Sequence, residues 1–414
     1  MAEAPAAPAE ATRRRALEAV FGATFFVRFA FGITLAVFAE YLTGHPGLSG
    51  GTVAAIGLVS GAAPVGEFST VLLSGVGADL WGRFRVLFLG MGGAAALFAL
   101  VFLTRDPLAL AAINFAFGVA SGAILAASLA VVAERAASDE RGFEMGRFDA
   151  VNLSGWIAGY AFGLVLLDLV PDPKLGISFL FGSLILGLGF FVALHLARGI
   201  PPRHPAAGHR IREILGTAFR GPVLLVTLPW LVIYMLIGFA LVFFGSAAKT
   251  TSVPLLYLAA GIAAGGALLV VTQPRFGRLA DRFGRDRMMA VGVAGFVAVM
   301  GCASLLVAYG TPIPLLVATG ASVLAALAYG PAALAALADL AQRTSRATTM
   351  AIYSLTISLG MWVGLIAGTQ LYDRLGNEGL YVFFGSIAVG LVALTLARFA
   401  TERRAGASPT TPVR

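Results

Sequence analysis

Two charged side chains lie deep inside long apolar stretches of the sequence. Arg28 is about 11 residues into the first stretch, and Glu67 precedes Asp79, the next acidic residue, by 12 residues. In a helix that rises about 1.5 Å per residue, both would lie roughly 17–18 Å from the same end of their helices. If these stretches cross a membrane, a charge at that depth costs about 2.5–3.5 kcal/mol, so each side chain requires a partner or water. We predict that Arg28 and Glu67 form an ion pair between neighbouring helices.

Three kinds of chemistry are open to this pair. It could be a structural ion pair that only holds two helices together. Glu67 could bind and release a proton, because a neighbouring cation keeps a carboxylate ionised until substrate binding or a conformational change alters the contact. Arg28 could bind an anionic substrate, because a guanidinium matches carboxylate and phosphate groups.

The composition indicates that membrane helices position these residues. Hydrophobic residues make up 58% of the 414 residues and charged residues only 12%, too few to cover the surface of a soluble fold. Apolar runs of about 20 residues recur along the chain, each long enough to cross a hydrocarbon core of about 30 Å. We therefore predict an all-α membrane protein.

Twelve transmembrane helices follow from this pattern, in two pseudo-symmetric bundles of six. The expected spans are 17–42, 52–75, 86–104, 108–133, 146–168, 176–197, 222–246, 254–274, 288–309, 313–338, 347–370 and 379–400. The expected domains are an N-terminal tail at 1–16, a bundle at 17–197, a linker at 198–220, a second bundle at 221–400 and a C-terminal tail at 401–414.

The basic residues indicate which side of the membrane each connection faces. Four of the 29 Lys and Arg residues lie in the links of one side, namely Arg105, Lys174, Lys249 and Arg374. Arg28 lies within a span, and the other 24 lie near or in the tails and links of the opposite side. Because positive charge is retained in the cytoplasm, both termini are expected to be cytoplasmic. The scarcity of Lys relative to Arg is typical of GC-rich prokaryotes, so the inner membrane is the expected location.

The two halves of the sequence repeat each other. The link GVGADLWGRFR (Gly75–Arg85) recurs as GRLADRFGRDR (Gly277–Arg287), each after the second span of its half. At an offset of 205 residues, a row of glycines recurs as well: Gly155, Gly159 and Gly163 align with Gly360, Gly364 and Gly368. Duplicated halves with a shared site between them are a known plan of transporters.

Both links resemble the signature of the major facilitator superfamily, roughly G-x-x-x-D-x-x-G-R-x-R/K. The resemblance implies a latch that closes the cytoplasmic side while the transporter faces outward. Glycine permits a tight turn, and an aspartate can bind arginines or a helix N-terminus. The candidate residues of this gating motif are Gly75, Asp79, Gly82, Arg83, Gly277, Asp281, Gly284 and Arg285.

The sequence departs from the proton-driven drug antiporters of that family at two positions. Asn114 stands on the fourth span where many members carry an Arg linked to proton coupling. Tyr160 stands on the fifth span where the drug antiporters carry a Pro. These differences weaken the drug-antiporter assignment and leave the fold assignment intact.

The family resemblance implies that the first, fourth, seventh and tenth helices line a central path. The candidate cavity residues on the last three of them are Asn114, Ser121, Trp230, Tyr234, Ser322 and Tyr329, in pairs four or seven residues apart on one helical face. Such pairs could also be packing seams. Asp149 and Asn152, near the inner end of the fifth span, could belong to a loop network with Asp79 or to a substrate site, and we assign them to the loop network.

These residues predict a secondary active transporter. The sequence contains no metal-ligand cluster, nucleotide-binding loop or nucleophile motif, so we expect no enzyme activity, catalytic residue, metal, cofactor or nucleic-acid partner. The expected partners are the lipid bilayer, a small-molecule substrate and a proton, and the family resemblance implies a monomer. Our first hypothesis is proton-coupled export of a small amphipathic solute by antiport. The alternative is uptake or exchange of a small organic anion bound through Arg28, and a remote alternative is a membrane receptor that does not transport.

Overall fold

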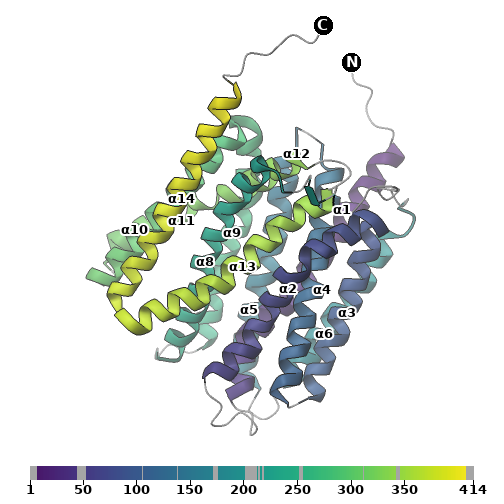
Figure 1. Cartoon of the computed structure of the whole chain (residues 1–414). Helices are drawn as coiled ribbons and strands as arrows, with labels where there is room; N and C mark the ends of the chain where they lie inside the picture. The colour runs from purple at the N-terminus through teal and green to yellow at the C-terminus, as the bar shows by residue number, and fades with distance from the viewer. Residues whose placement is uncertain are drawn as a thin grey trace.

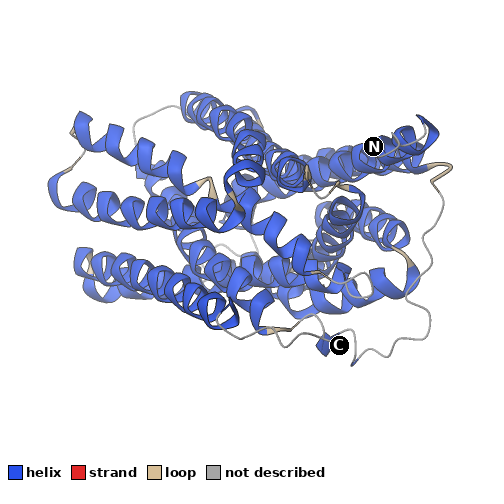
Figure 2. Cartoon of the chain, turned by 90° about the horizontal axis from the view of Figure 1, so that it is seen from above, coloured by secondary structure: helices blue, strands red, loops and turns tan. Residues whose placement is uncertain are grey.

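The protein is a bundle of long helices in a computed structural model (Figure 1). The structure describes residues 7–43, 53–104, 106–137, 139–170, 176–200, 212, 215–216, 219–250, 255–310, 312–341 and 346–406. Most of the expected linker 198–220 and the outer parts of both expected tails lie outside these residues. The described residues form helices without any strand (Figure 2).

The helices follow one another through short connections. Their bounds are α1 Ala7–Thr43, α2 Val53–Trp81, α3 Arg83–Leu103, α4 Pro107–Arg135, α5 Arg141–Leu169, α6 Ile177–Ala197, α8 Gly221–Thr250, α9 Leu255–Phe283, α10 Arg285–Tyr309, α11 Ile313–Ala326, α12 Tyr329–Leu340, α13 Arg346–Leu375 and α14 Asn377–Gly406. Ten spans of the described chain are long and apolar enough to cross a membrane, with α11 and α12 counted as one. The helices α2 and α9, of 29 residues each, complete the expected twelve.

The tenth expected span is divided into two helices. The sequence predicts one helix over 313–338, whereas α11 ends at Ala326 and α12 begins at Tyr329. Pro331 lies in the first turn of α12. Its ring would clash with the carbonyl of Leu327 in a continuous helix, and it has no N–H to bond that carbonyl. The helix is therefore interrupted four residues before the proline.

The helices form two halves that meet along two matched pairs. In the first half, α5 packs against α1, and α4 packs against α2 and α3. In the second half, α13 packs against α8, and α11 and α14 pack against α10. Between the halves, α5 lies against α9 and α2 lies against α13. Below, the terminal end means the end of the bundle at which α1 begins and α14 ends (top of Figure 1).

The repeated glycines lie where two helices approach closely within each half. A Cβ at Gly159 of α5 would overlap the carbonyl oxygen of Phe29 on α1. A Cβ at Gly364 of α13 would overlap the carbonyl oxygen of Met235 on α8 in the same way. Small residues allow such backbone contact between membrane helices. The glycine row therefore builds the same seam, α1–α5 and α8–α13, in both halves.

We expect Gly159→Ala to destabilise the protein by about 1–3 kcal/mol, because the added methyl group forces two backbones apart. Thermal unfolding of the detergent-solubilised protein would measure this effect. Gly187 on α6 is the control, since its Cβ would meet nothing within 4 Å. Gly187→Ala should leave stability unchanged or raise it by up to about 1 kcal/mol, because Ala favours helix over Gly. Equal effects of the two substitutions would contradict the close-packed seam.

Candidate functional site

A cavity lies between the two halves, with an empty volume of about 530 Å³. Helices α1, α2, α5, α8 and α13 contribute its walls. The lining residues are Arg28, Phe31, Pro64, Glu67, Asn152, Leu153, Trp156, Tyr234, Ile357, Ser358 and Met361. Most are apolar or aromatic, and two are charged, which is typical of a site for an amphipathic organic molecule.

Arg28 enters the cavity from α1 with a neutral partner. Its Nε donates a hydrogen bond of 2.8 Å to Asn152 Oδ1 on α5. Its guanidinium lies 5.9 Å from the centre of the Phe31 ring. Among the described residues, this is the one hydrogen bond that Arg28 makes, and no carboxylate oxygen lies within 4.0 Å of its nitrogens. Among the described residues, no ion pair therefore occupies the positive charge or the two Nη groups of Arg28.

Glu67 enters the same cavity from α2 and links the two halves. The Ser354 hydroxyl on α13 donates a hydrogen bond of 2.6 Å to Glu67 Oε1. Glu67 is 5% exposed and Arg28 is 7% exposed, so both charges are buried. The structure brings the two side chains to one cavity as neighbours. Among the described residues of this conformation, Arg28 and Glu67 form no direct ion pair with each other.

Aromatic rings line the cavity, and a second aromatic cluster contacts Tyr234. Phe31 and Trp156 stack with ring centres 5.8 Å apart. Deeper toward the terminal end, Trp230 makes edge contacts at 5.1 Å with both Tyr329 and Tyr353 and lies 5.7 Å from Tyr234. These rings give the cavity flat apolar faces next to the buried charges.

The structure distributes the other candidate cavity residues over different sites. Tyr234 lines the cavity, and Trp230 packs against Tyr234 without being among the lining residues. Tyr329 donates a hydrogen bond to the Val226 carbonyl at 3.1 Å. Asn114 donates to the Val59 carbonyl at 2.7 Å and so fastens α4 to α2.

The two candidate serines also lie outside the cavity. Ser121 is buried within α4, 1% exposed. Ser322 donates to the Ala318 carbonyl of its own helix at 2.8 Å and lies 4.0 Å from the thiol of Cys302. Most of these candidate polar residues therefore hydrogen-bond to backbone carbonyls or pack against other helices. Their spacing in the sequence does not reveal this.

The assignment of Asp149 and Asn152 to a loop network with Asp79 is wrong. Asn152 binds Arg28 in the cavity. Asp79 binds the start of α13 instead. Both Asp149 and Asn152 are buried on α5. The polar run near Arg147 suggested a loop, but it is the first three turns of a helix that packs along α9.

Several lining residues were not predicted from the sequence, among them Phe31, Pro64, Trp156 and Ser358. The family resemblance implied a lining by the first, fourth, seventh and tenth helices, whereas α2, α5 and α13 contribute most of it. The one available signal was the polar Asn152 three residues from another buried polar residue, Asp149, inside an apolar span.

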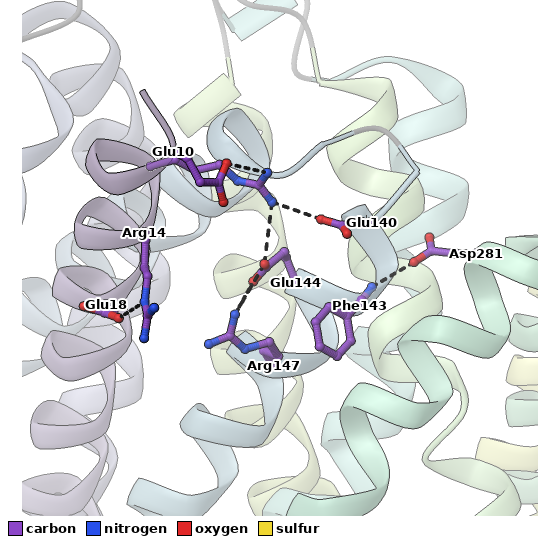
Figure 3. A network of polar contacts seen from close by, with 9 residues as sticks. Glu10, Arg14, Glu18, Glu140, Phe143, Glu144, Arg147 and Asp281 are labelled. Atoms are coloured by element: carbon purple, nitrogen blue, oxygen red, sulfur yellow. Dashed lines mark hydrogen bonds and ion pairs between the residues drawn. The ribbon is translucent and has the colours of Figure 1, made fainter. Parts of the chain in front are cut away.

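At the terminal end, an aspartate of each half caps a helix of the other half. Asp79 accepts hydrogen bonds from the N–H groups of Ala347 and Thr348 at 3.0 and 2.9 Å, and from the Thr348 hydroxyl at 2.9 Å. Asp281 accepts from the N–H groups of Gly142 and Phe143, both at 2.9 Å (Figure 3). Free N–H groups and the helix dipole make each helix N-terminus a site for a carboxylate. The two caps join the halves symmetrically.

Arginines of the same links reinforce the two caps. Arg83 lies 3.8 Å from Asp79 and also pairs with Glu134. Arg285 lies 3.9 Å from Asp281 and also pairs with Asp339. Each arginine thus connects its aspartate to the end of another helix of its own half, α4 for Arg83 and α12 for Arg285.

A further group of ion pairs fixes the start of α1 against the start of α5 (Figure 3). Arg13 contacts Glu140 at 3.2 Å and Glu144 at 3.7 Å, and Arg147 binds Glu144 at 3.1 Å. These ion pairs brace the first half at the terminal end, where the two aspartate caps join the halves.

The glycines of the repeated link have two different roles. Gly82 and Gly284 have φ angles of +102° and +95°, which favour glycine, and they allow the chain to turn into α3 and α10. Gly75 and Gly277 lie where the halves touch. A Cβ at Gly75 would come 2.8 Å from Thr348 Cα, and one at Gly277 would overlap the Gly142 carbonyl. The motif therefore combines a turn, a cap and a close contact between the halves.

Comparisons with known proteins agree with this architecture. Residues 20–274 and 247–413 match the family model described as Major Facilitator Superfamily. The crystal structure of the human organic anion transporter MFSD10 (TETRAN) superposes with a TM-score of 0.71, covering 92% of this chain and 99% of that one. Sequence identity with it is 18%, so the likeness shows the fold alone. No curated protein sequence matches the chain.

Proposed function

Because the chain belongs to the major facilitator superfamily, whose members are transporters and not enzymes, we propose that it moves a small amphipathic organic anion by alternating access. The lining is mostly aromatic and aliphatic, which suits an amphipathic solute better than a sugar. The apolar body of the solute would lie against Phe31, Trp156 and Tyr234, and its anionic group would bind Arg28.

The observation that carries this proposal is the unpaired charge of Arg28. Had Glu67 neutralised it, a neutral or cationic amphiphile would suit the cavity, as our first hypothesis from sequence supposed. The Arg28 partner is instead the neutral amide of Asn152. A buried guanidinium with free Nη groups gains most from a carboxylate, sulfonate or phosphate, which it can bind with two parallel hydrogen bonds. The similar structure is that of an organic anion transporter, which is consistent with this choice.

The closed terminal end supports a mechanism in which the two halves rock about the cavity. The arginine-rich links gather at this end, so we assign it to the cytoplasm of a prokaryotic inner membrane. In that orientation, the latched structure is the outward-facing state. Breaking the caps at Asp79 and Asp281 would let the halves open toward the cytoplasm. Nothing in this mechanism requires a second copy of the chain, so we propose a monomer.

Proton coupling is the second part of the proposal, and Glu67 is its first candidate. Glu67 shares the cavity with Arg28 and contacts Ser354 of the opposite half. An anion bound at Arg28 would repel an ionised Glu67, so a proton on Glu67 would accompany the anion. If the site instead binds a cation or a neutral amphiphile, Glu67 would exchange a proton for it during export.

Thermal stabilisation of the detergent-purified protein by a matched set of probes tests the substrate class. The set is naphthalene-2-sulfonate, naphthalene-2-methanol and 2-naphthylmethylammonium, which share one aromatic body and differ in charge. We expect stabilisation by the sulfonate alone. Stabilisation by the ammonium or the alcohol in its place would overturn the anion proposal in favour of export of cationic or neutral amphiphiles.

We expect Glu67→Gln to tighten sulfonate binding several-fold, because the substitution removes a negative charge next to the bound anion. Isothermal titration calorimetry measures this. Asp168→Gln, an exposed position at the far end of α5, is the control and should have no effect. Weaker sulfonate binding by Glu67→Gln would exclude Glu67 as the coupling group.

A further inference from the structure

A second buried carboxylate, Asp149, lies beneath the cavity and is not used by the proposed substrate site. Asp149 is one helical turn from Asn152 on α5, on the side of the terminal end, and is 6% exposed. Among the described residues it has no ion pair. Burying an ionised carboxylate without a cationic partner is costly, and a bound proton removes that cost.

Asn152 connects Asp149 to Arg28. The amide oxygen of Asn152 accepts from Arg28 Nε, and Asn152 lies one helical turn after Asp149 on the same face of α5. An amide whose oxygen accepts from a cation has only its N–H groups left for a neighbouring carboxylate. The cation in the cavity and the carboxylate beneath it therefore belong to one network.

A partner for a proton on Asp149 comes from the other half. Gln273 on α9 is 1% exposed, and its Oε1 has no hydrogen-bond partner. Both side chains border Gly330 of α12, where a Cβ would lie 2.7 Å from Asp149 Oδ2 and 3.7 Å from Gln273 Oε1. A protonated carboxyl could donate to this buried acceptor, whereas an ionised one could not. Protonation would thus tie α5 to α9, the helices that meet between the halves.

The other groups around Asp149 either carry no charge or are charged groups that do not contact it directly. From α1 it faces Arg28 through Asn152, from α8 Tyr234 and from α13 Tyr353. Glu67 of α2 acts on Tyr234. The helices α9 and α12 present Gln273 and Gly330, which carry no charge.

We propose that Asp149 is a proton-binding site whose occupancy is linked, through Asn152, to the charge state of Arg28. The proton site itself does not depend on the proposed function. Its consequence, that an anion on Arg28 and a proton on Asp149 are taken up together, does rest on that function. An anion would cancel the positive potential that Arg28 exerts through Asn152, and the carboxylate would then hold its proton more tightly. By linkage, the proton strengthens anion binding by the same factor.

Infrared difference spectroscopy on the reconstituted full-length protein tests the proton site without any substrate. Protein labelled with carboxyl-¹³C aspartate should show an isotope-shifted carboxylic-acid band that disappears as pH rises. Asp149→Asn should remove this band, and Asp168→Asn, an exposed position on the same helix, should keep it. Retention of the band in Asp149→Asn would overturn the proposal, as would a band that responds to sodium and not to pH.

Two variants that leave Asp149 in place test the network itself. In Arg28→Gln the band should persist to a pH higher by about one unit or more, because the neighbouring positive charge that favours the carboxylate is gone. In Gln273→Leu the band should move to higher frequency, because the carboxyl loses its acceptor. An unchanged band in both would overturn the linkage. Since no substrate is present, a failure here is separate from a failure of the probe anions to bind.

Discussion

Arg28→Gln should lower the uptake of naphthalene-2-sulfonate into proteoliposomes by about 100-fold. Removing one partner of a buried, charge-assisted contact costs about 2–5 kcal/mol, and each 1.4 kcal/mol is a factor of ten. The loss should appear at the binding step, because Gln keeps one hydrogen bond to Asn152 but offers no charge to the anion. Initial rates over a range of sulfonate concentrations would separate binding from turnover.

Two further variants make this result specific. Arg28→Lys keeps the charge and loses the two parallel donors, so we expect it to retain an intermediate rate, about 10-fold below the wild type. Arg220→Gln removes an exposed arginine outside the cavity and should transport normally. Equal uptake by Arg28→Gln and the wild type would show that the anion does not bind this guanidinium. Loss of folding is checked by the thermal unfolding of each variant in detergent.

The double substitution Asp79→Asn, Asp281→Asn should open the terminal end. Each aspartate accepts two backbone N–H groups from a helix of the other half. Charge-assisted hydrogen bonds contribute about 1.5–3 kcal/mol each, and Asn retains only one neutral acceptor. Losing about 2 kcal/mol at each cap would shift the closed-to-open ratio by roughly 30-fold per site.

Pulsed electron paramagnetic resonance would measure the opening. Spin labels at Trp81→Cys and Phe283→Cys, in a Cys302→Ser background, report the distance between the halves at the terminal end; both positions are at least half exposed. The double variant should populate a longer distance than the parent. Asp106→Asn is the control, because Asp106 also caps a helix, accepting from Ala109 at 2.7 Å, but entirely within one half. An unchanged distance distribution in the double variant would show that the caps do not hold the terminal end closed.

The sequence by itself determined the elements and their approximate membrane spans. Hydropathy is a property of contiguous residues, so an apolar run long enough to cross a bilayer predicts a helix wherever it packs. The turn in each repeated link is also determined locally, because the positive φ at Gly82 and Gly284 is a backbone conformation that glycine itself permits. The depth of Arg28 and Glu67 also followed from counting residues, and both do enter one cavity.

Only the tertiary structure decided which side chains meet. Arg28 and Asn152 are 124 residues apart in the chain, and Asp79 and Thr348 are 269 residues apart. Such contacts depend on how each helix is rotated and tilted against its neighbour, and a rotation of less than half a turn moves a side chain from the cavity to a packing seam. Asn114 and Ser322 lie on the predicted helices but satisfy backbone carbonyls there. Residue type and depth therefore come from the sequence, whereas the partner of a buried charge, which sets its chemistry, comes from the packing of the two halves.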